Sequence, residues 1–288
     1  DFNASLDPLT VTVLPNNGVI SGLSGDNLVN KAADFNNGLS SVAAKLKFTG
    51  LKGPHTFVVT SESGKVGTSS QVEILPGALS YLQIRNAPGG NGGIVGNGSL
   101  RSGDALQLYA AGYDSSNNFI QDQTVAWIGT GVAANFLTPV NGPSTVFNAT
   151  VPGSGVINAT VGSIFAQTGT ITVEAGQAAK LVFLSKPYDG GYGHNQPVIA
   201  NQASGKIVAQ LQDIVGNVIP ATSERVVTLT SSGVGEFSAL SSDWQATTQL
   251  AMAVGQSQVE FYYRSGTSGD YQITVATTDH VSSASQAI

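Results

Sequence analysis

Oxygen-bearing side chains alternate along one segment of this 288-residue sequence. Asp114, Asn118 and Asp122 occupy even-numbered positions, much as the ligands of an EF-hand calcium loop alternate. Such a loop also needs Gly at its sixth and Glu at its twelfth position, where this segment has Phe119 and Val125. Since any strand also produces alternation, the segment favours a hairpin turn. Asp114, Asn118 and Asp122 are the candidates for a Ca²⁺ site, and no other cofactor is expected.

Residue types that carry out catalysis are scarce and scattered. The three histidines, His55, His194 and His280, have no spacing that would place two of them on one helix face around a metal. The absence of Cys excludes thiol nucleophiles and thiolate metal sites. No Gly-x-Ser-x-Gly elbow of a serine hydrolase is present. The sequence therefore predicts a protein without catalytic residues that is not an enzyme.

Aromatic side chains mark two places where a ligand or a partner could bind. Tyr188, Tyr192 and His194 lie in a Gly-rich loop, and Trp244 follows a short polar segment. Aromatic rings can stack on sugars, and an exposed Trp often anchors a protein interface. These four residues are the candidates for binding a glycan or a protein.

The composition restricts the class of protein further. Apolar residues make up 41% of the chain and charged residues 10%, with a net charge of −6 and no basic cluster. Nucleic-acid binding is therefore not expected, and no apolar run is long enough for membrane insertion. Few Lys and Glu and no Cys fit an exported prokaryotic protein, so we expect an extracellular or cell-surface location.

An internal repeat organises the chain. Gly77 and Gly176 each follow the end of one predicted strand and precede an alternating one, 99 residues apart (176 minus 77). That spacing is the size of one immunoglobulin-like sandwich. Two Asp-x-x-x-Asn turns, at 114–118 and 213–217, follow at corresponding positions. They predict hairpin turns in which Asn or Gly adopts a positive φ.

The repeat divides the chain into three parts. We expect the second half of an immunoglobulin-like repeat at 1–75 and whole domains at 76–174 and 175–288. The sequence pattern of residues 9–18 is similar to that of residues 226–235. We therefore expect the first repeat to lack its opening strands. Half a sandwich would expose unpaired strand edges. Either the chain is part of a longer protein, or strands of a neighbouring subunit complete it by β-strand addition.

The sequence resembles the bacterial immunoglobulin-like repeats of invasin-type and intimin-type surface proteins, and it is similar to filamin-type repeats. The resemblance is carried by the openers 76–78 and 175–177, by the two Asp-x-x-x-Asn turns, and by Gly269-Asp270-Tyr271, which is like a tyrosine corner. The first two repeats depart from the family because His55 and the segment 155–157 replace that Tyr. The resemblance implies an all-β stack of tandem modules without catalytic residues.

Three functions fit these observations. The first is a structural segment that acts as a stalk or as a building block of an extracellular filament, sheath or surface layer, with neighbouring copies or domains as partners. The second is an adhesin segment that binds a host protein or a glycan. The third is an accessory spacer of a secreted enzyme.

Overall fold

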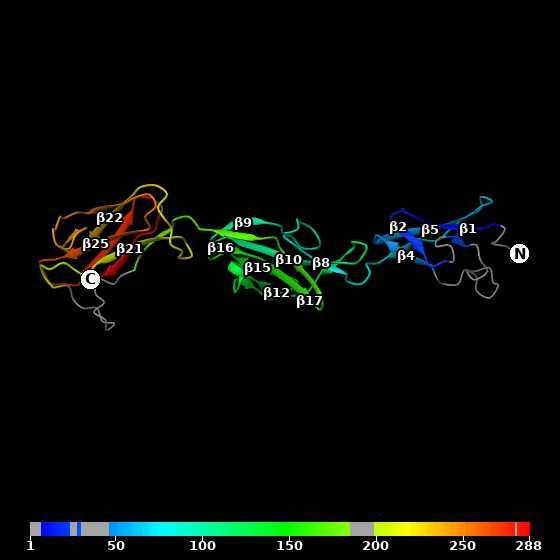
Figure 1. Ribbon diagram of the computed structural model, residues 1–288, viewed down its shortest axis with the longest axis horizontal. Helices are drawn as coiled ribbons and strands as arrows, with labels where there is room; N and C mark the ends of the chain where they lie inside the picture. The colour runs from blue at the N-terminus through cyan, green and yellow to red at the C-terminus, as the bar shows by residue number, and fades with distance from the viewer. Residues whose placement is uncertain (1–6, 24–27, 30–45, 185–198, 280) are drawn as a thin grey trace.

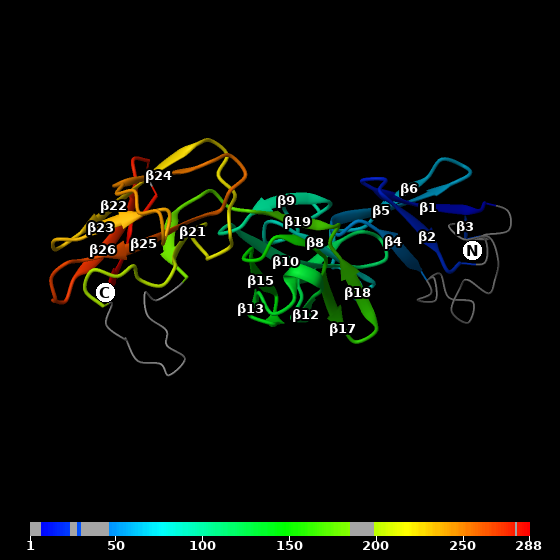
Figure 2. The same cartoon turned by 60° about the vertical axis from the view of Figure 1, so that its left-hand side comes forward.

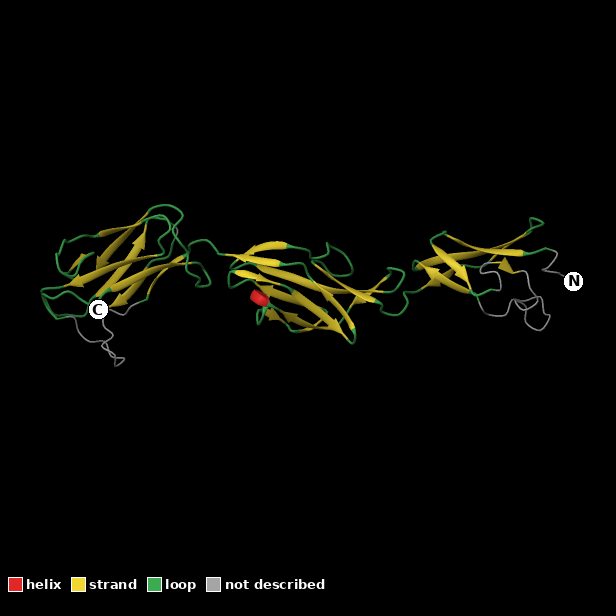
Figure 3. Ribbon diagram, viewed as in Figure 1, coloured by secondary structure: helices red, strands yellow, loops and turns green. Residues whose placement is uncertain are grey.

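The computed structural model of the protein describes residues 7–23, 28–29, 46–184, 199–279 and 281–288. These residues form β-strands and loops, with one short 3₁₀ turn at Gly131–Ala133 (Figure 3). The strands lie in three groups along a row (Figure 1), which we call module 1 (1–75), module 2 (76–174) and module 3 (175–288). No strand pairing among the described residues crosses 75/76 or 174/175. The expected all-β fold of tandem immunoglobulin-like sandwiches is confirmed.

Module 3 is a sandwich of two four-stranded sheets. One has the order β20-β21-β25-β23 and the other β24-β22-β26-β27. Its strands are β20 (Lys180–Phe183), β21 (Ile207–Gln212), β22 (Arg225–Ser231), β23 (Glu236–Ser238), β24 (Gln249–Met252), β25 (Gln258–Arg264), β26 (Gln272–Thr277) and β27 (Ala284–Ala287). Every second residue of β21 is buried, as expected when one face of a sheet covers a core. The core of the module includes Leu211, Leu229, Phe261 and Ile273.

Module 2 repeats this plan. Its strands are β8 (Tyr81–Arg85), β9 (Gly98–Arg101), β10 (Ala105–Tyr113), β11 (Phe119–Asp122), β12 (Val125–Gly129), β13 (Leu137–Thr138), β14 (Asn141–Gly142), β15 (Ser144–Asn148), β16 (Gly153–Gly155), β17 (Ile157–Val161), β18 (Ile164–Gln167) and β19 (Ile171–Glu174). A sheet containing β8, β10 and β15 faces the sheet β14-β12-β17-β18. Strand β9 runs parallel to β19 along one edge (Figure 2). Trp127 of β12 is 2% exposed and donates from Nε1 to the Gly142 carbonyl.

Module 1 contains β1 (Leu9–Leu14), β2 (Gly18–Ser21), β3 (Leu28–Val29), β4 (Lys47–Gly50), β5 (Gly53–Ser61), β6 (Val66–Thr68) and β7 (Val72–Ile74). Strand β1 pairs with β5 as β22 pairs with β26, and β2 pairs with β4 as β23 pairs with β25. The buried residues described in its core are Val11, Val13, Ile20 and Leu23. Its described strands thus match the later strands of modules 2 and 3.

The difference between module 1 and the other two lies beside β4. Strands β15 and β25 each have a partner on both edges, and β10 and β21 connect them to β8 and β20. Strand β4 pairs with β2 on one edge, and its other edge has no partner within the described ranges of module 1.

Candidate functional site

Each boundary between two modules is built around one buried aspartate. In module 2, Asp114 is 5% exposed and closes the turn between β10 and β11. Its Oδ1 accepts hydrogen bonds from the amides of Ser116 and Asn118, both 2.9 Å. Its Oδ2 accepts from the Gly77 amide at 2.8 Å and from the Asn118 side chain at 2.9 Å. A single carboxylate therefore holds both the turn and the segment that enters the module.

Asp213 repeats this arrangement in module 3. It is fully buried, and its Oδ1 accepts from the amides of Val215, Gly216 and Asn217 at 3.1, 2.8 and 2.8 Å. Its Oδ2 accepts from the Asn217 side chain at 2.9 Å and from the Gly176 amide at 3.4 Å. The two aspartates lie 99 residues apart (213 minus 114). The repeat in sequence is thus a repeat in hydrogen bonding.

The positive φ expected in these turns is present in both. Asn117 has φ +65° and Gly216 has φ +104°. Asn and Gly adopt the left-handed region more easily than other residues. The prediction of hairpin turns at the two Asp-x-x-x-Asn segments is therefore confirmed.

The Asn of each turn also bonds to the preceding module. Asn118 Nδ2 donates to the Gly50 carbonyl at 2.9 Å, and its Oδ1 accepts from the Lys52 amide at 2.8 Å. Asn217 Nδ2 lies 2.7 Å from the Thr150 carbonyl and 2.7 Å from Ser102 Oγ. Gly50 ends β4 and Thr150 follows β15 closely, and β4 and β15 hold corresponding positions in their modules. The same side chain therefore bonds to the same place on two successive modules.

Lys52 adds a second contact at the first junction. Its Nζ donates to the Phe119 carbonyl at 2.7 Å and lies 5.6 Å from the centre of the Phe119 ring. At the second junction, the Ile214 side chain lies against Gly103. A Cβ atom added to this glycine would lie 3.1 Å from Ile214 Cγ2. The two junctions share the Asp–Asn pair and differ in these outer contacts.

Hydrogen bonding sets the charge state of both aspartates. Burial acts to raise the pKa of Asp114, but the hydrogen bonds from Gly77, Asn118 and Ser116 outweigh burial and hold that pKa below its ordinary value. Burial of Asp213 acts in the same direction, and hydrogen bonds, led by those from Asn217, again lower the pKa. Both carboxylates are therefore charged at neutral pH and accept hydrogen bonds only.

This geometry bears on the calcium candidates. Asp114 and Asn118 lie together, whereas Asp122 lies at the end of β11, where its Oδ2 accepts from the Gly89 amide at 2.8 Å. Both oxygens of Asp114 face N–H donors, which a cation would have to displace. Over the described ranges, no three His, Asp or Glu side chains lie together in a way that could hold a metal ion.

The predicted ligand loop at Tyr188, Tyr192 and His194 lies outside the described residues, as does His280. Trp244 is described and half-buried. Its ring stacks on the Arg264 guanidinium at 4.3 Å, and its Nε1 donates to Glu236 Oε2 at 3.1 Å. Arg264 also forms an ion pair of 2.9 Å with Glu236. Trp244 thus belongs to a surface cluster of three residues on module 3.

The residue at the tyrosine-corner position differs between modules, as expected from the sequence: it is Tyr271 in module 3 and His55 in module 1. Tyr271 donates from its hydroxyl to the Thr267 carbonyl at 3.3 Å, which is the backward bond to the backbone typical of a tyrosine corner. Its hydroxyl also lies 2.8 Å from Thr267 Oγ1. His55 is 1% exposed, and its ring nitrogens lie 2.8 Å from the Gly53 carbonyl and 2.7 Å from Asn17 Oδ1. Its polar atoms are used within module 1, which agrees with a structural role.

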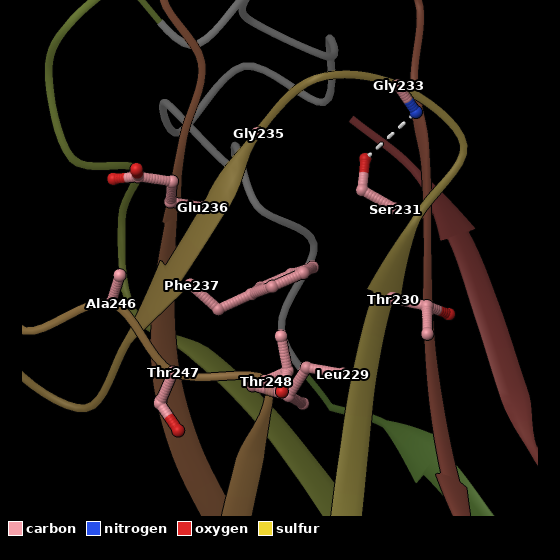
Figure 4. A pocket seen from close by; sticks show the side chains of 10 residues that line it. All are labelled: Leu229, Thr230, Ser231, Gly233, Gly235, Glu236, Phe237, Ala246, Thr247 and Thr248. Carbon is pink, nitrogen blue, oxygen red and sulfur yellow. Dashed lines mark hydrogen bonds between the residues drawn. The ribbon is translucent and has the colours of Figure 1, made fainter.

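A cavity of about 600 Å³ opens between β22 and β23 in module 3. Figure 4 shows the Phe237 ring pointing into the space between these strands, with Ser231 accepting from the Gly233 amide at 3.3 Å on the far side. Phe237 is 4% exposed and belongs to the core. The cavity is therefore the open side of the sandwich, where core side chains come closest to the surface.

The sequence did not identify the residues that receive each Asn. Gly50 and Thr150 act through backbone carbonyls, which leave no trace in residue type. The sequence does show that three residue types repeat at a constant spacing. Gly, Asp and Asn occur at 77, 114 and 118 and again 99 residues later, at 176, 213 and 217. A repeated polar pair at the end of a module indicates a contact with its neighbour.

No protein-family model matches the sequence. No curated protein matches it.

Solved structures with a similar fold include the Escherichia coli adhesin FdeC, at 14% identity and a TM-score of 0.37, with 95% of this chain and 94% of that chain covered. The S-layer protein rSbsC(31-844) is similar at 14% identity and a TM-score of 0.28, covering 97% of this chain and 34% of that chain. The β-glucuronidase of Parabacteroides merdae is similar at 13% identity and a TM-score of 0.27, covering 67% of this chain and 23% of that chain.

The chain thus spans about a quarter of the glucuronidase and about a third of the S-layer protein. At 13 to 14% identity, none of the three assigns a role to this chain. The first two are an adhesin and a surface-layer protein.

Proposed function

We propose that the chain is a structural segment of a secreted or cell-surface prokaryotic protein, in which coupled immunoglobulin-like modules form a stalk or a building block of a filament, sheath or surface layer. One observation carries this proposal: both junctions use the same Asp–Asn pair to bond to the preceding module. A chain of independent domains would need no such repeat, because linkers alone would connect them. Coupling each module to the next gives a rod that resists bending.

The proposal assigns no catalysis to this chain. The buried Asp114 and Asp213 are used for hydrogen bonds within and near the turns, and buried His55 is bonded within module 1. In the described part of the chain, no helix has the length and apolarity that crossing a membrane requires. Neighbouring copies or domains of the same protein are the proposed partners, with no role for nucleic acid.

Module 1 is the proposed place of strand exchange between subunits. In modules 2 and 3, two earlier strands lie beside β15 and β25. We propose that the edge of β4 that has no partner among the described residues takes two strands equivalent to β20 and β21, and that a neighbouring subunit can supply them by β-strand addition. This would bury apolar side chains of module 1 such as Phe48, which is half-buried. Light scattering after size-exclusion chromatography tests the exchange, since a monomer at every concentration would exclude it.

Electron microscopy of the native material tests the structural role. Ordered filaments, sheaths or lattices are expected. Isolated molecules that show no lateral or end-to-end order would contradict the proposal and favour an adhesin segment or an enzyme spacer.

One observation supports the adhesin alternative. The Trp244 ring, Arg264 and Glu236 form a surface cluster of an aromatic ring with both charge signs, and such clusters can hold a sugar or a protein side chain. Glycan-array binding that is lost in Trp244→Ala would support this alternative. Binding that is unchanged in that variant would exclude this cluster as the site.

A further inference from the structure

We propose that the end of module 3 farthest from module 2 is a socket for the Asp-x-x-x-Asn turn of a further immunoglobulin-like module. The inference rests on the proposed function, since it extends the row of coupled modules by one more. We call the surface formed by Asn201, Val234, Glu236 and residues 264–267 the distal socket.

The distal socket corresponds to the surface of module 2 that receives Asn217. In module 2, the Gly103 amide donates to the Ala149 carbonyl at 2.7 Å, next to the acceptor Thr150. In module 3, the Asn201 amide donates to the Ser265 carbonyl at 2.8 Å, next to Gly266. The same backbone bond therefore joins the same two loops in both modules, and it places Gly266 where Thr150 stands.

Backbone conformation supports the correspondence. Gly103 has φ +101° and Asn201 has φ +65°, so both loops turn through the left-handed region at the equivalent residue. Gly103 is also the residue that the Ile214 side chain approaches from module 3. A residue equivalent to Ile214 on an incoming turn would therefore approach Asn201.

Within the described part of the chain, the distal socket is hollow. A cavity of about 750 Å³ is lined by Asn201, Val234, Gly235, Glu236 and residues 264–267. Figure 1 shows the loops near residues 200 and 265 at the end of the row, away from module 2. Val234 is 68% exposed there. The lining of the cavity includes Gly266, the equivalent of Thr150, and Asn201, the equivalent of Gly103.

The occupant has to be a turn that is not yet engaged. Asn118 and Asn217 already bond to modules 1 and 2, so a second copy of the described chain offers no free turn of this kind. The chemistry therefore points to an additional module that carries its own Asp and Asn four residues apart.

The test appends a second copy of residues 75–174 directly after Ile288. Hydrogen exchange, read by mass spectrometry, is compared over the peptides that contain Asn201 and residues 265–267. We expect these peptides to exchange about tenfold more slowly in the extended chain, the factor that ~1.4 kcal/mol of net contact gives. The matched control carries Asn118→Ala in the appended copy only, and it should exchange as fast as the unextended chain. Peptides over residues 105–113, present in both copies, report whether the appended copy is folded.

Cysteine trapping gives a second, independent reading, because the native chain contains no Cys. Ser115 is the residue 99 positions before Ile214 (214 minus 115). Asn201→Cys combined with Ser115→Cys in the appended copy should form a disulfide, detected as a loss of two hydrogens in the intact mass. Gly103→Cys with Ile214→Cys in the unextended chain is the positive control. If the appended copy does not fold, the disulfide reading is made with residues 175–288 appended and Ile214→Cys in that copy, because the exchange peptides would then occur twice in the chain.

Unchanged exchange together with no disulfide in a folded extended chain would overturn the proposal. A glycan or another protein that protects the distal socket while the appended module does not would also overturn it. The exchange and disulfide measurements do not depend on the native assembly. Isolated molecules in electron micrographs would therefore contradict the proposed function without affecting the result for the distal socket.

Discussion

The side-chain amide of Asn217 lies 2.7 Å from the Thr150 carbonyl oxygen in the preceding module and 2.9 Å from Asp213 Oδ2 in its own. One amide nitrogen therefore connects two modules, and the buried aspartate fixes its direction. Asn118 does the same between Gly50 and Asp114. The stiffness of the row is predicted to depend on these two side chains.

Removing one Asn should open one junction and leave the other closed. In Asn118→Ala the Lys52 amide loses its acceptor, Asn118 Oδ1, so its hydrogen exchange should accelerate strongly. The junction should lose roughly 1–3 kcal/mol, the usual effect of removing one partner of a buried hydrogen bond. Exchange measured by NMR at Lys52 checks this. Asn217→Ala is the matched control, and equal acceleration at Lys52 in both variants would contradict the account.

The stability of modules 2 and 3 should depend on pH through Asp114 and Asp213. Their pKa values are lower in the folded protein than the ordinary value of 3.8. Their contribution is therefore complete above the unfolded pKa and is lost as the pH falls through the lower folded pKa. Asp213→Asn should destabilise module 3 by roughly 1–3 kcal/mol at neutral pH and should weaken this acid dependence. Thermal unfolding from pH 7 to pH 3 checks both effects. Identical slopes in the wild type and the variant would count against the assignment.

Substitution by Ala should destabilise the protein more at Gly176, which opens module 3, than at Gly77, which opens module 2. A Cβ at Gly176 would lie 2.9 Å from Asp213 Cβ and 3.0 Å from the Ser102 carbonyl, whereas a Cβ at Gly77 would meet Asp114 Oδ2 at 3.5 Å. Gly176→Ala should therefore cost roughly 1–3 kcal/mol through overpacking, and Gly77→Ala should be close to neutral. Denaturant unfolding of the two variants measures the difference. Equal destabilisation would show that the second junction is not as tight as described.

Calcium should have no effect at the Asp114 turn. Both oxygens of Asp114 face N–H donors, and a bound cation would require these donors to move away. We expect calorimetric titration with Ca²⁺ to give no heat and the melting temperature to be the same with Ca²⁺ and with EDTA. A rise in melting temperature with Ca²⁺ that is absent in Asp114→Asn would contradict this and restore the metal site.

Local chemistry explains which features the sequence predicted. The turns at Asn117 and Gly216 were predictable because few residue types adopt a positive φ. Asp114 and Asn118 form a polar pair whose spacing favoured a hairpin turn, but their residue types also fit a cation site. The number of N–H donors that reach the carboxylate decides between the two, and this depends on tertiary structure.

The partners across each junction could not be predicted in the same way. Gly50 and Thr150 differ in type and share a carbonyl oxygen at the end of corresponding strands. Backbone acceptors impose no restriction on the side chain, so no pattern marks them. The cluster of Trp244, Arg264 and Glu236 was also only partly predictable, because residues up to 28 positions apart (264 minus 236) meet there through the pairing of β23 with β25.

Small-angle X-ray scattering of the 288-residue chain and of the double variant Asn118→Ala, Asn217→Ala tests the coupling of the modules most directly. We expect the wild type to scatter as a single extended rod whose dimensions match the row of three modules. We expect the variant, with each module still folded by circular dichroism, to require an ensemble of bent conformations. Identical profiles, or a wild type that already requires such an ensemble, would contradict the claim that the two Asn side chains couple the modules.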